Sequence, residues 1–215
     1  MCFAQIYIIN SMFTIQSGLF MVMAYDRYIA ICKPLQYPLI ISDHYLLKAC
    51  SVAIVGGLVV CLPMVVLTSE LNYCDRNLIG QCFCETLKVA NLACVRNNVI
   101  NMYVFVIVWF TTGFDMVLIS FSYCMIVRAV LRLQSKEAAS KTFSTCASHL
   151  VVICYYYSSV VILVITSVMG EKIISEVHTL LAILFSLIPP ALNPVVYGLR
   201  TTEIRAKIFS MIKKS

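Results

Sequence analysis

The chain has 215 residues, of which 61% are hydrophobic and only 12% are charged. Soluble domains carry roughly 25% charged residues. Together with a mean hydropathy of +0.91, this composition excludes an ordinary soluble domain and indicates one membrane domain. The net charge of +6 does not indicate a nucleic-acid partner, because the basic residues are spread over several loops instead of forming one patch.

Five apolar runs reach the length of about 20 residues that a helix needs to cross a bilayer. They are too long, and alternate too little, for the strands of a membrane barrel. We therefore predict an all-α membrane protein. A short amphipathic helix on the inner leaflet is expected at 200–213, with a disordered basic tail as the alternative. The expected membrane helices cover about residues 1–28, 46–69, 97–129, 142–168 and 176–198.

The basic residues between these runs predict the orientation of the chain. Twelve lysines and arginines fall on one side of the membrane and four on the other. Because the richer side usually faces the cytoplasm, we expect the amino terminus outside and the carboxyl terminus in the cytoplasm of a plasma-membrane protein.

An acid–base pair, Asp26 and Arg27, follows the first 25 uncharged residues. A charge at the centre of a bilayer costs roughly 2.5–3.5 kcal/mol, so the pair fits a membrane boundary. In the simpler interpretation the pair ends the span and Pro34 ends the helix. In the alternative the pair is a switch, in which Asp26 holds the permanently charged Arg27 until a moving helix offers another partner.

Three sequence strings share one resemblance. The first runs from Met23 to Tyr37 and reads MAYDRYIAICKPLQY. It resembles the cytoplasmic end of the third helix of rhodopsin-like G-protein-coupled receptors, in the form that olfactory receptors carry. The string KTFSTCASHL from Lys141 resembles the start of their sixth helix, and NPVVY from Asn193 resembles the proline hinge of their seventh.

This resemblance implies a rhodopsin-like seven-helix bundle of which five transmembrane helices, the third to the seventh, are present. The resemblance covers 1–215 as a single receptor domain. The chain is then expected to be a fragment without the first two helices, either part of a longer sequence or the product of a truncated gene. The lone Asp115 in the third run resembles the fish-like branch of the family. By itself such a residue is either a hydrogen-bonded group facing the bundle or a functional one.

The polar loop before the third run contains Cys74, Cys82, Cys84 and Cys94. In an oxidising compartment these thiols pair, but the sequence alone leaves the pairing open. A zinc site around Cys82 and Cys84 is a minor alternative, because the usual gaps between ligands are missing. The resemblance implies the disulfides Cys2–Cys84 and Cys74–Cys94, with no metal.

The resemblance also implies a small-molecule pocket among the outer halves of the helices. No acid replaces Ile9, where amine receptors carry Asp, so a cationic amine held by a salt bridge is disfavoured. Taken singly, each expected lining residue fits core packing, but the set is mostly apolar with a few hydroxyls, as such sites usually are. The set is Asn10, Phe13, Thr14, Ser17, Ile107, Val108, Thr111, Tyr157, Val160, Val161, Val164 and Ile183.

No catalytic arrangement is visible, since the three histidines are scattered and no phosphate-binding glycine loop occurs, so we expect neither an enzyme nor a cofactor. The resemblance implies an odorant-activated receptor in the lipid bilayer, without a nucleic-acid partner. A small volatile or water-soluble odorant would release the Arg27 switch and open a cytoplasmic cleft for a stimulatory, olfactory-type G protein, which raises cAMP. The expected switch residues are Asp26, Arg27, Tyr28, Tyr123, Lys141, His149, Asn193, Pro194 and Tyr197.

Two alternatives remain at this stage. A truncated remnant that does not signal is one, because a bundle without two helices leaves interhelical surface open. A transporter or channel is the other, although the sequence lacks the internal repeat that such proteins often have.

Overall fold

A computed structural model describes residues 1–74, 79, 83–95, 98–132 and 135–169, together with eight isolated residues between 180 and 210. Within this part every regular element is a helix. Most of the expected helix at 176–198 and of the expected tail at 200–213 lies outside the described residues, as does Cys82.

Four described helices are long and apolar enough to cross a membrane, which confirms the all-α membrane class. In the last of them the apolar stretch is Cys146–Leu163. Short elements join the long helices: a 3-10 turn, η1 (Pro34–Gln36), α2 (Tyr37–Ile40) and α4 (Thr86–Ala90). The long helices are α1 (Cys2–Cys32), α3 (Asp43–Ser69), α5 (Asn98–Leu131) and α6 (Lys136–Met169).

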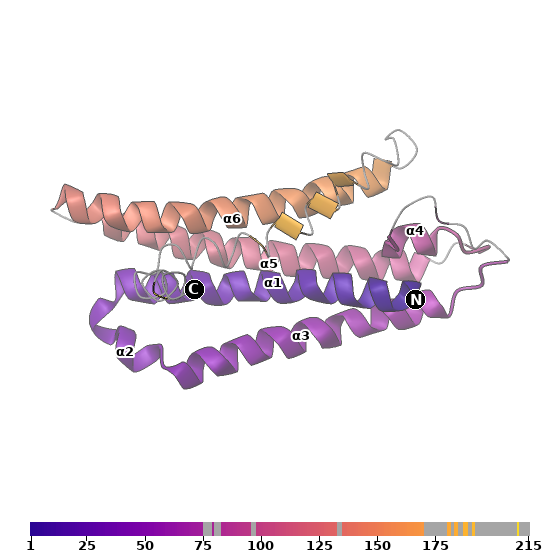
Figure 1. The fold of residues 1–215 in the computed structure, drawn as a ribbon, viewed down its shortest axis with the longest axis horizontal. Coiled ribbons are helices and arrows are strands. Elements are labelled where there is room, and N and C mark those ends of the chain that lie inside the picture. The colour runs from indigo at the N-terminus through magenta and orange to yellow at the C-terminus, as the bar shows by residue number, and fades with distance from the viewer. Residues whose placement is uncertain are drawn as a thin grey trace.

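Helix α1 is the central element of the bundle. It packs along most of its length against α3 on one side and α5 on the other (Figure 1). Helix α6 lies beside α5 and also contacts α1, through side chains such as Tyr156. The amino terminus and α4 lie at one end, which we term the disulfide end. α2 and the start of α6 lie at the other, which we term the Arg27 end (Figure 1).

The end of α1 is set by a proline and not by the charged pair. The helix continues to Cys32, four residues beyond the expected end. The next residue, Lys33, has φ −138° and ψ 55° and precedes Pro34, whose ring excludes the helical conformation from the residue before it.

Two other helices begin earlier than the apolar runs indicated. α3 begins at Asp43 because the Ser42 hydroxyl caps it, accepting a hydrogen bond from the Tyr45 N–H at 3.2 Å. α6 begins at Lys136, where residues 136–139, two of them charged and two alanine, are good helix formers. Capping and helix propensity therefore extend both helices past the lipid-facing stretch.

Pro63 interrupts the hydrogen bonding inside α3. It has no N–H, so the carbonyl of Val59 loses its helical donor. One residue further, the Val60 carbonyl accepts a hydrogen bond from the Tyr103 hydroxyl of α5 at 2.8 Å. A side chain from a neighbouring helix thus adds hydrogen bonding where the proline weakens α3.

Small residues allow α1 and α3 to approach closely. A Cβ atom built on Gly57 would lie 2.6 Å from Cγ1 and 3.0 Å from the backbone nitrogen of Ile15. One built on Gly18 would lie 3.0 Å from the Ala53 Cβ. Such glycine contacts permit dispersion packing between membrane helices. Gly56, by contrast, has no atom within 4 Å of its Cβ position.

We expect Gly57→Ala to lower the free energy of unfolding by about 1–3 kcal/mol, the usual cost of overpacking. Gly56→Ala is the matched control and should be neutral or stabilising, because alanine favours a helix over glycine by about 0.8–1.0 kcal/mol. Thermal unfolding of both purified variants in detergent measures the difference. Equal effects of the two substitutions would contradict the close contact.

Candidate ligand site

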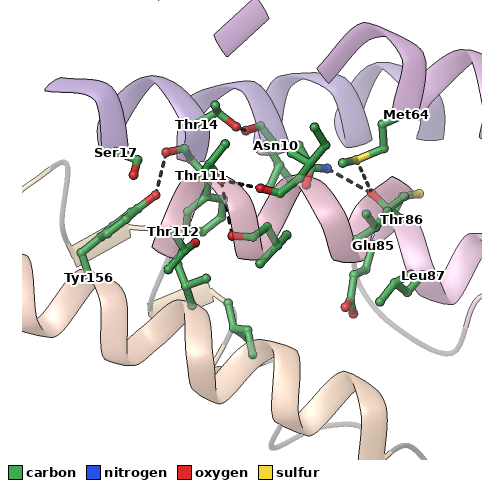
Figure 2. A pocket seen from close by; sticks show the side chains of 18 of the residues that line it. Asn10, Thr14, Ser17, Met64, Glu85, Thr86, Leu87, Thr111, Thr112 and Tyr156 are labelled. Atoms are coloured by element: carbon green, nitrogen blue, oxygen red, sulfur yellow. Dashed lines mark hydrogen bonds between the residues drawn. The ribbon is translucent and has the colours of Figure 1, made fainter. Parts of the chain in front are cut away.

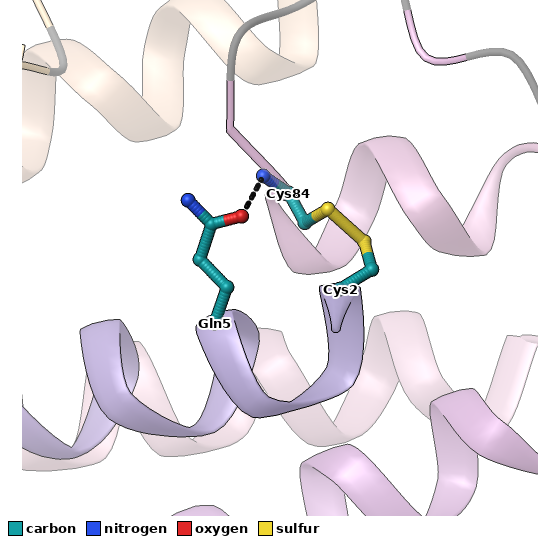
Figure 3. Close-up of a disulfide and its surroundings, with 3 residues drawn as sticks. All are labelled: Cys2, Gln5 and Cys84. Carbon is teal, nitrogen blue, oxygen red and sulfur yellow. Dashed lines mark hydrogen bonds between the residues drawn. A yellow bond between two sulfur atoms is a disulfide. The ribbon is translucent and has the colours of Figure 1, made fainter.

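Two disulfides fix the loop at the disulfide end. Cys2 and Cys84 are joined with their Cα atoms 5.5 Å apart, and Cys74 and Cys94 with theirs 5.9 Å apart. These are the pairings that the resemblance implied, and they leave no Cys84 thiolate for the zinc alternative. The Gln5 Oε1 atom also accepts a hydrogen bond from the Cys84 N–H at 3.1 Å (Figure 3). The segment after Cys84 is therefore held against the start of α1.

This segment lines a cavity of about 180 Å³. Residues of α1, α5 and α6 form its walls, and α4 with the residues before it covers the disulfide end (Figure 2). The volume is below the roughly 300–1,000 Å³ of pockets for drug-sized molecules. It is close to the 150 Å³ that holds benzene in an engineered protein cavity. The cavity therefore fits a small ligand.

Most of the residues predicted from the sequence come together here. Tyr157 lies just beyond the cavity and bonds to one of its lining residues, Ser17. The structure does not place Val161 or Ile183 on the cavity wall, and the Val164 side chain lies outside the described part. Val161 is 45% exposed, because successive helix residues point about 100° apart and Val160 already faces inward. The lining residues among those predicted are Asn10, Phe13, Thr14, Ser17, Ile107, Val108, Thr111 and Val160.

Several lining residues were not predicted from the sequence. For the lining residues that follow Cys84, the implied Cys2–Cys84 disulfide was a usable sequence signal, because it brings this part of the loop over α1. The helical ones had no sequence signal, since they lie in helices that are apolar on every side. The main unpredicted residues are Met64, Glu85, Thr86, Thr112 and Tyr156.

A chain of hydrogen bonds ties α4 to the wall of the cavity. The Asn10 Nδ2 amide donates to the Ile6 carbonyl at 2.8 Å and to the Thr86 Oγ1 at 3.1 Å. Thr86 in turn donates to the Met64 sulfur at 3.4 Å (Figure 2). One residue from each of α1, α3 and α4 is thus joined beside the cavity.

Ser17 links three helices at the inner end of the cavity. Its hydroxyl donates to the Asp115 carboxyl of α5, and the Tyr157 hydroxyl of α6 lies 3.0 Å from it. A hydroxyl has one hydrogen, so Tyr157 is the donor in the second bond. Asp115 is 6% exposed and faces the bundle, which agrees with the interpretation of this residue as a buried hydrogen-bonded group.

Tyr156 joins α6 to α1 next to this cluster. Its hydroxyl donates to the Phe13 carbonyl at 2.6 Å, and its ring meets that of Phe20 edge-on with the centroids 5.2 Å apart. The cavity therefore ends at a contact between α1 and α6.

The structure corrects the expectation that Asp26 holds Arg27. Within the described residues no ion pair joins them, and the Asp26 carboxylate accepts a hydrogen bond from the Tyr37 hydroxyl at 2.9 Å. Neighbouring residues on a helix do not face each other, so Asp26 bonds to the following turn instead. Burial and the bond to Asp26 raise the pKa of Tyr37 above its usual value, so this hydroxyl stays protonated at neutral pH.

Other predicted switch residues lie in the part of the hydrophobic core toward the Arg27 end. Tyr123 of α5 and His149 of α6 are hydrogen-bonded through the hydroxyl and Nδ1, and both are buried. Tyr28 packs against the same core. Four predicted positions lie outside the described part: the side chain of Lys141 and the residues Asn193, Pro194 and Tyr197.

We expect Ser17→Ala to destabilise the fold by about 1–3 kcal/mol, because it removes the Ser17 hydrogen bond from the buried Asp115 carboxyl. Ser11 provides the control on the same helix, since it is 1% exposed and its hydroxyl has no hydrogen-bond partner among the described residues. Ser11→Ala should be neutral or slightly stabilising. Thermal unfolding of the two variants measures both effects, and a Ser17→Ala variant as stable as Ser11→Ala would refute the role given to the cluster.

Membrane-length helices around a cavity of this size define a multi-pass helical membrane protein with a site for a small molecule. The family model described as "Olfactory receptor" matches residues 1–215. Olfactory receptors 56A3 and 56A4 of Homo sapiens are 42% and 44% identical to the chain over 99% of its length and 68% of theirs. Olfactory receptor 56B34 of Mus musculus is 44% identical over 98% of the chain and 66% of its own length.

The chain belongs to the olfactory receptor family. It is therefore a G-protein-coupled odorant receptor by family and a multi-pass plasma-membrane protein, and its relatives are receptors and not enzymes.

Proposed function

We propose that an odorant binds in the cavity of about 180 Å³ and activates this chain as a receptor. The cavity supports this proposal by its size and its lining, which is mostly apolar with a few hydroxyl groups. Three of its walls come from helices that also reach the Arg27 end, so a change in their packing extends to that end.

The position of Ser17 is the observation that carries the proposal. Ser17 lines the cavity and bonds to Asp115 of α5 and Tyr157 of α6. A ligand that touches this hydroxyl acts on the relative position of three helices at once. A ligand that fits one arrangement of these helices better than another shifts the population toward that arrangement.

At the Arg27 end the proposed readout is a cleft for a stimulatory G protein, followed by a rise in cAMP. Tyr123 and His149 join α5 to α6 there, and a movement of α6 separates or repacks them. Arg27 has no ion pair with Asp26 to break and takes a new partner as the cleft opens. Tyr123 is the proposed partner within the described part of the chain.

We further propose that the disulfide end faces the outside of the cell and the Arg27 end the cytoplasm. Disulfides form in oxidising compartments, and both lie at the first end. The excess of lysine and arginine lies on the second side, as expected for cytoplasmic loops.

In cells that express the chain, we expect an odorant panel to raise cAMP and Arg27→Ala to abolish this rise at equal surface expression. Lys48→Ala removes an exposed positive charge from α3 near the same end and should leave the response intact. A normal response from Arg27→Ala would exclude the proposed switch. A chain that reaches the surface and answers no odorant would favour the remnant that does not signal.

A second substitution tests the cavity itself. Val108→Phe fills part of the cavity and should shift the concentration for half-maximal cAMP response upward by at least about tenfold, since roughly 1.4 kcal/mol of lost affinity is tenfold. Val106 is 51% exposed on the same helix, so Val106→Phe is the control and should respond as the unchanged chain does. Equal responses from the two variants would place the odorant elsewhere.

A further inference from the structure

Helix α5 presents one face to the cavity. The lining residues of this helix recur at intervals of three and four, so they form a single stripe along it. They are Val104, Ile107, Val108, Thr111 and Thr112. Because α5 begins at the disulfide end, the stripe is apolar toward that end and carries its two hydroxyl groups at the inner end of the cavity (Figure 1). A ligand therefore meets the polar side chains of this stripe only at the inner end.

Most side-chain donors of the lining are already used within the protein. Both N–H groups of the Asn10 amide are bonded, to the Ile6 carbonyl and to Thr86. Thr111 donates to the Ile107 carbonyl of its own helix at 2.7 Å. Each hydroxyl has one hydrogen, so a hydroxyl that donates inside the protein offers a ligand only lone pairs. The lining hydroxyls that donate in this way are those of Thr14, Ser17, Thr86, Thr111 and Tyr156.

Thr112 is the exception. Within the described part of the chain its hydroxyl makes no hydrogen bond, although it lines the cavity. A threonine hydroxyl in a helix can bond to the carbonyl four residues earlier, which here is that of Val108. That carbonyl is the acceptor of the helical N–H of Thr112 and also lies 3.4 Å from the Thr111 hydroxyl. Among the described lining side chains, Thr112 is thus the one hydroxyl with a hydrogen left to donate.

The surroundings of Thr112 decide which ligand groups fit. A ligand that shuts this hydroxyl off from water and offers no acceptor leaves its hydrogen unbonded, whereas a ligand oxygen gives it a partner. No described lining residue is basic, so a carboxylate would enter without a counter-charge. An ammonium group has no lone pair and cannot accept at all. The group that fits is therefore a neutral oxygen.

We propose that Thr112 recognises the ligand by donating a hydrogen bond to a neutral ligand oxygen, that of a carbonyl or a hydroxyl group. The cavity then prefers a small ketone or alcohol over a hydrocarbon of the same shape. This inference rests on the proposed function, in which the cavity is the odorant site. The volume of about 180 Å³ limits the ligand to a ring-sized molecule.

The same bond orients the ligand in the cavity. Figure 2 shows Thr112 beside Thr111, toward the end of the cavity where Ser17 and Tyr156 lie. The ligand oxygen is therefore directed toward the contacts that join α1 to α5 and α6, and the apolar part of the ligand toward α4. The sequence pointed to Thr111 for this role, but the hydrogen of that hydroxyl is used within α5.

Three compounds of one shape test the proposal: cyclohexanone, cyclohexanol and methylenecyclohexane, in which a CH2 group replaces the ketone oxygen. The chain is reconstituted in lipid nanodiscs, and its thermal midpoint is measured against the concentration of each compound. We expect the ketone and the alcohol to raise the midpoint at concentrations about tenfold lower than the alkene does. The ratio is then compared among variants in the same nanodiscs, so that partition into the lipid cancels.

The variant Thr112→Val keeps the shape of the side chain and removes its hydroxyl. It should bring the ratio between ketone and alkene to about one, with the midpoint of the ligand-free chain unchanged, because this hydroxyl bonds to nothing in the protein. Thr112→Ser keeps the hydroxyl and should keep the ratio. Thr111→Val is the matched comparison on the same wall. It changes the wall equally for both compounds, so the ratio should stay at about tenfold.

Four outcomes would overturn the proposal: equal binding of ketone and alkene by the unchanged chain, a ratio that survives Thr112→Val, a ratio lost as fully in Thr111→Val, or binding of none of the three to the folded chain. These results are separable from the proposed function, because the nanodisc measurement involves no G protein. A chain that raises cAMP with odorants regardless of Thr112 keeps its function and loses this recognition. A chain that binds cyclohexanone through Thr112 but never raises cAMP keeps the recognition and loses the signalling role.

Discussion

Close packing and hydrogen bonds between helices hold this bundle together, because lipid tails are as apolar as the side chains and the hydrophobic effect contributes little there. Every polar group inside the bilayer also needs a partner from the protein. Ser17 meets both requirements, since it bonds to α5 and α6 from the central helix. The bond from Tyr103 to the Val60 carbonyl does the same for α5 and α3. These contacts fix the position of each helix along the axis of its neighbour.

The cavity exists because the loop at the disulfide end is held in place. Without the tie between Cys2 and Cys84, nothing in the loop's own short helix, α4, would keep it over α1, since a helix of five residues has little stability of its own. The disulfide and the hydrogen bond from Asn10 to Thr86 act together. Covalent chemistry at one end of the chain thus shapes the site that the helices leave open.

Helix α1 connects the two ends that the proposed mechanism needs. Its 31 residues form one continuous element, with cavity residues such as Asn10 near its start and Arg27 in its last turns. The contacts that would transmit a change in helix packing from one end to the other follow one another along α1. They are Ser17 with α5 and α6, then Phe20 against His149 and Tyr156, close to the Tyr123–His149 bond.

The sequence by itself determined the family and the four membrane helices that the structure describes. Long apolar runs that do not alternate are stable in lipid only as helices, and Pro34 carries the chemistry that ends one. The rotation of each helix was decided only by the tertiary structure. These helices are apolar on every side, so no pattern separates an inward residue from a lipid-facing one. This is why Tyr156 and Glu85 reach the cavity while Val161 does not, a distinction that required the neighbouring helices and the disulfide-held loop.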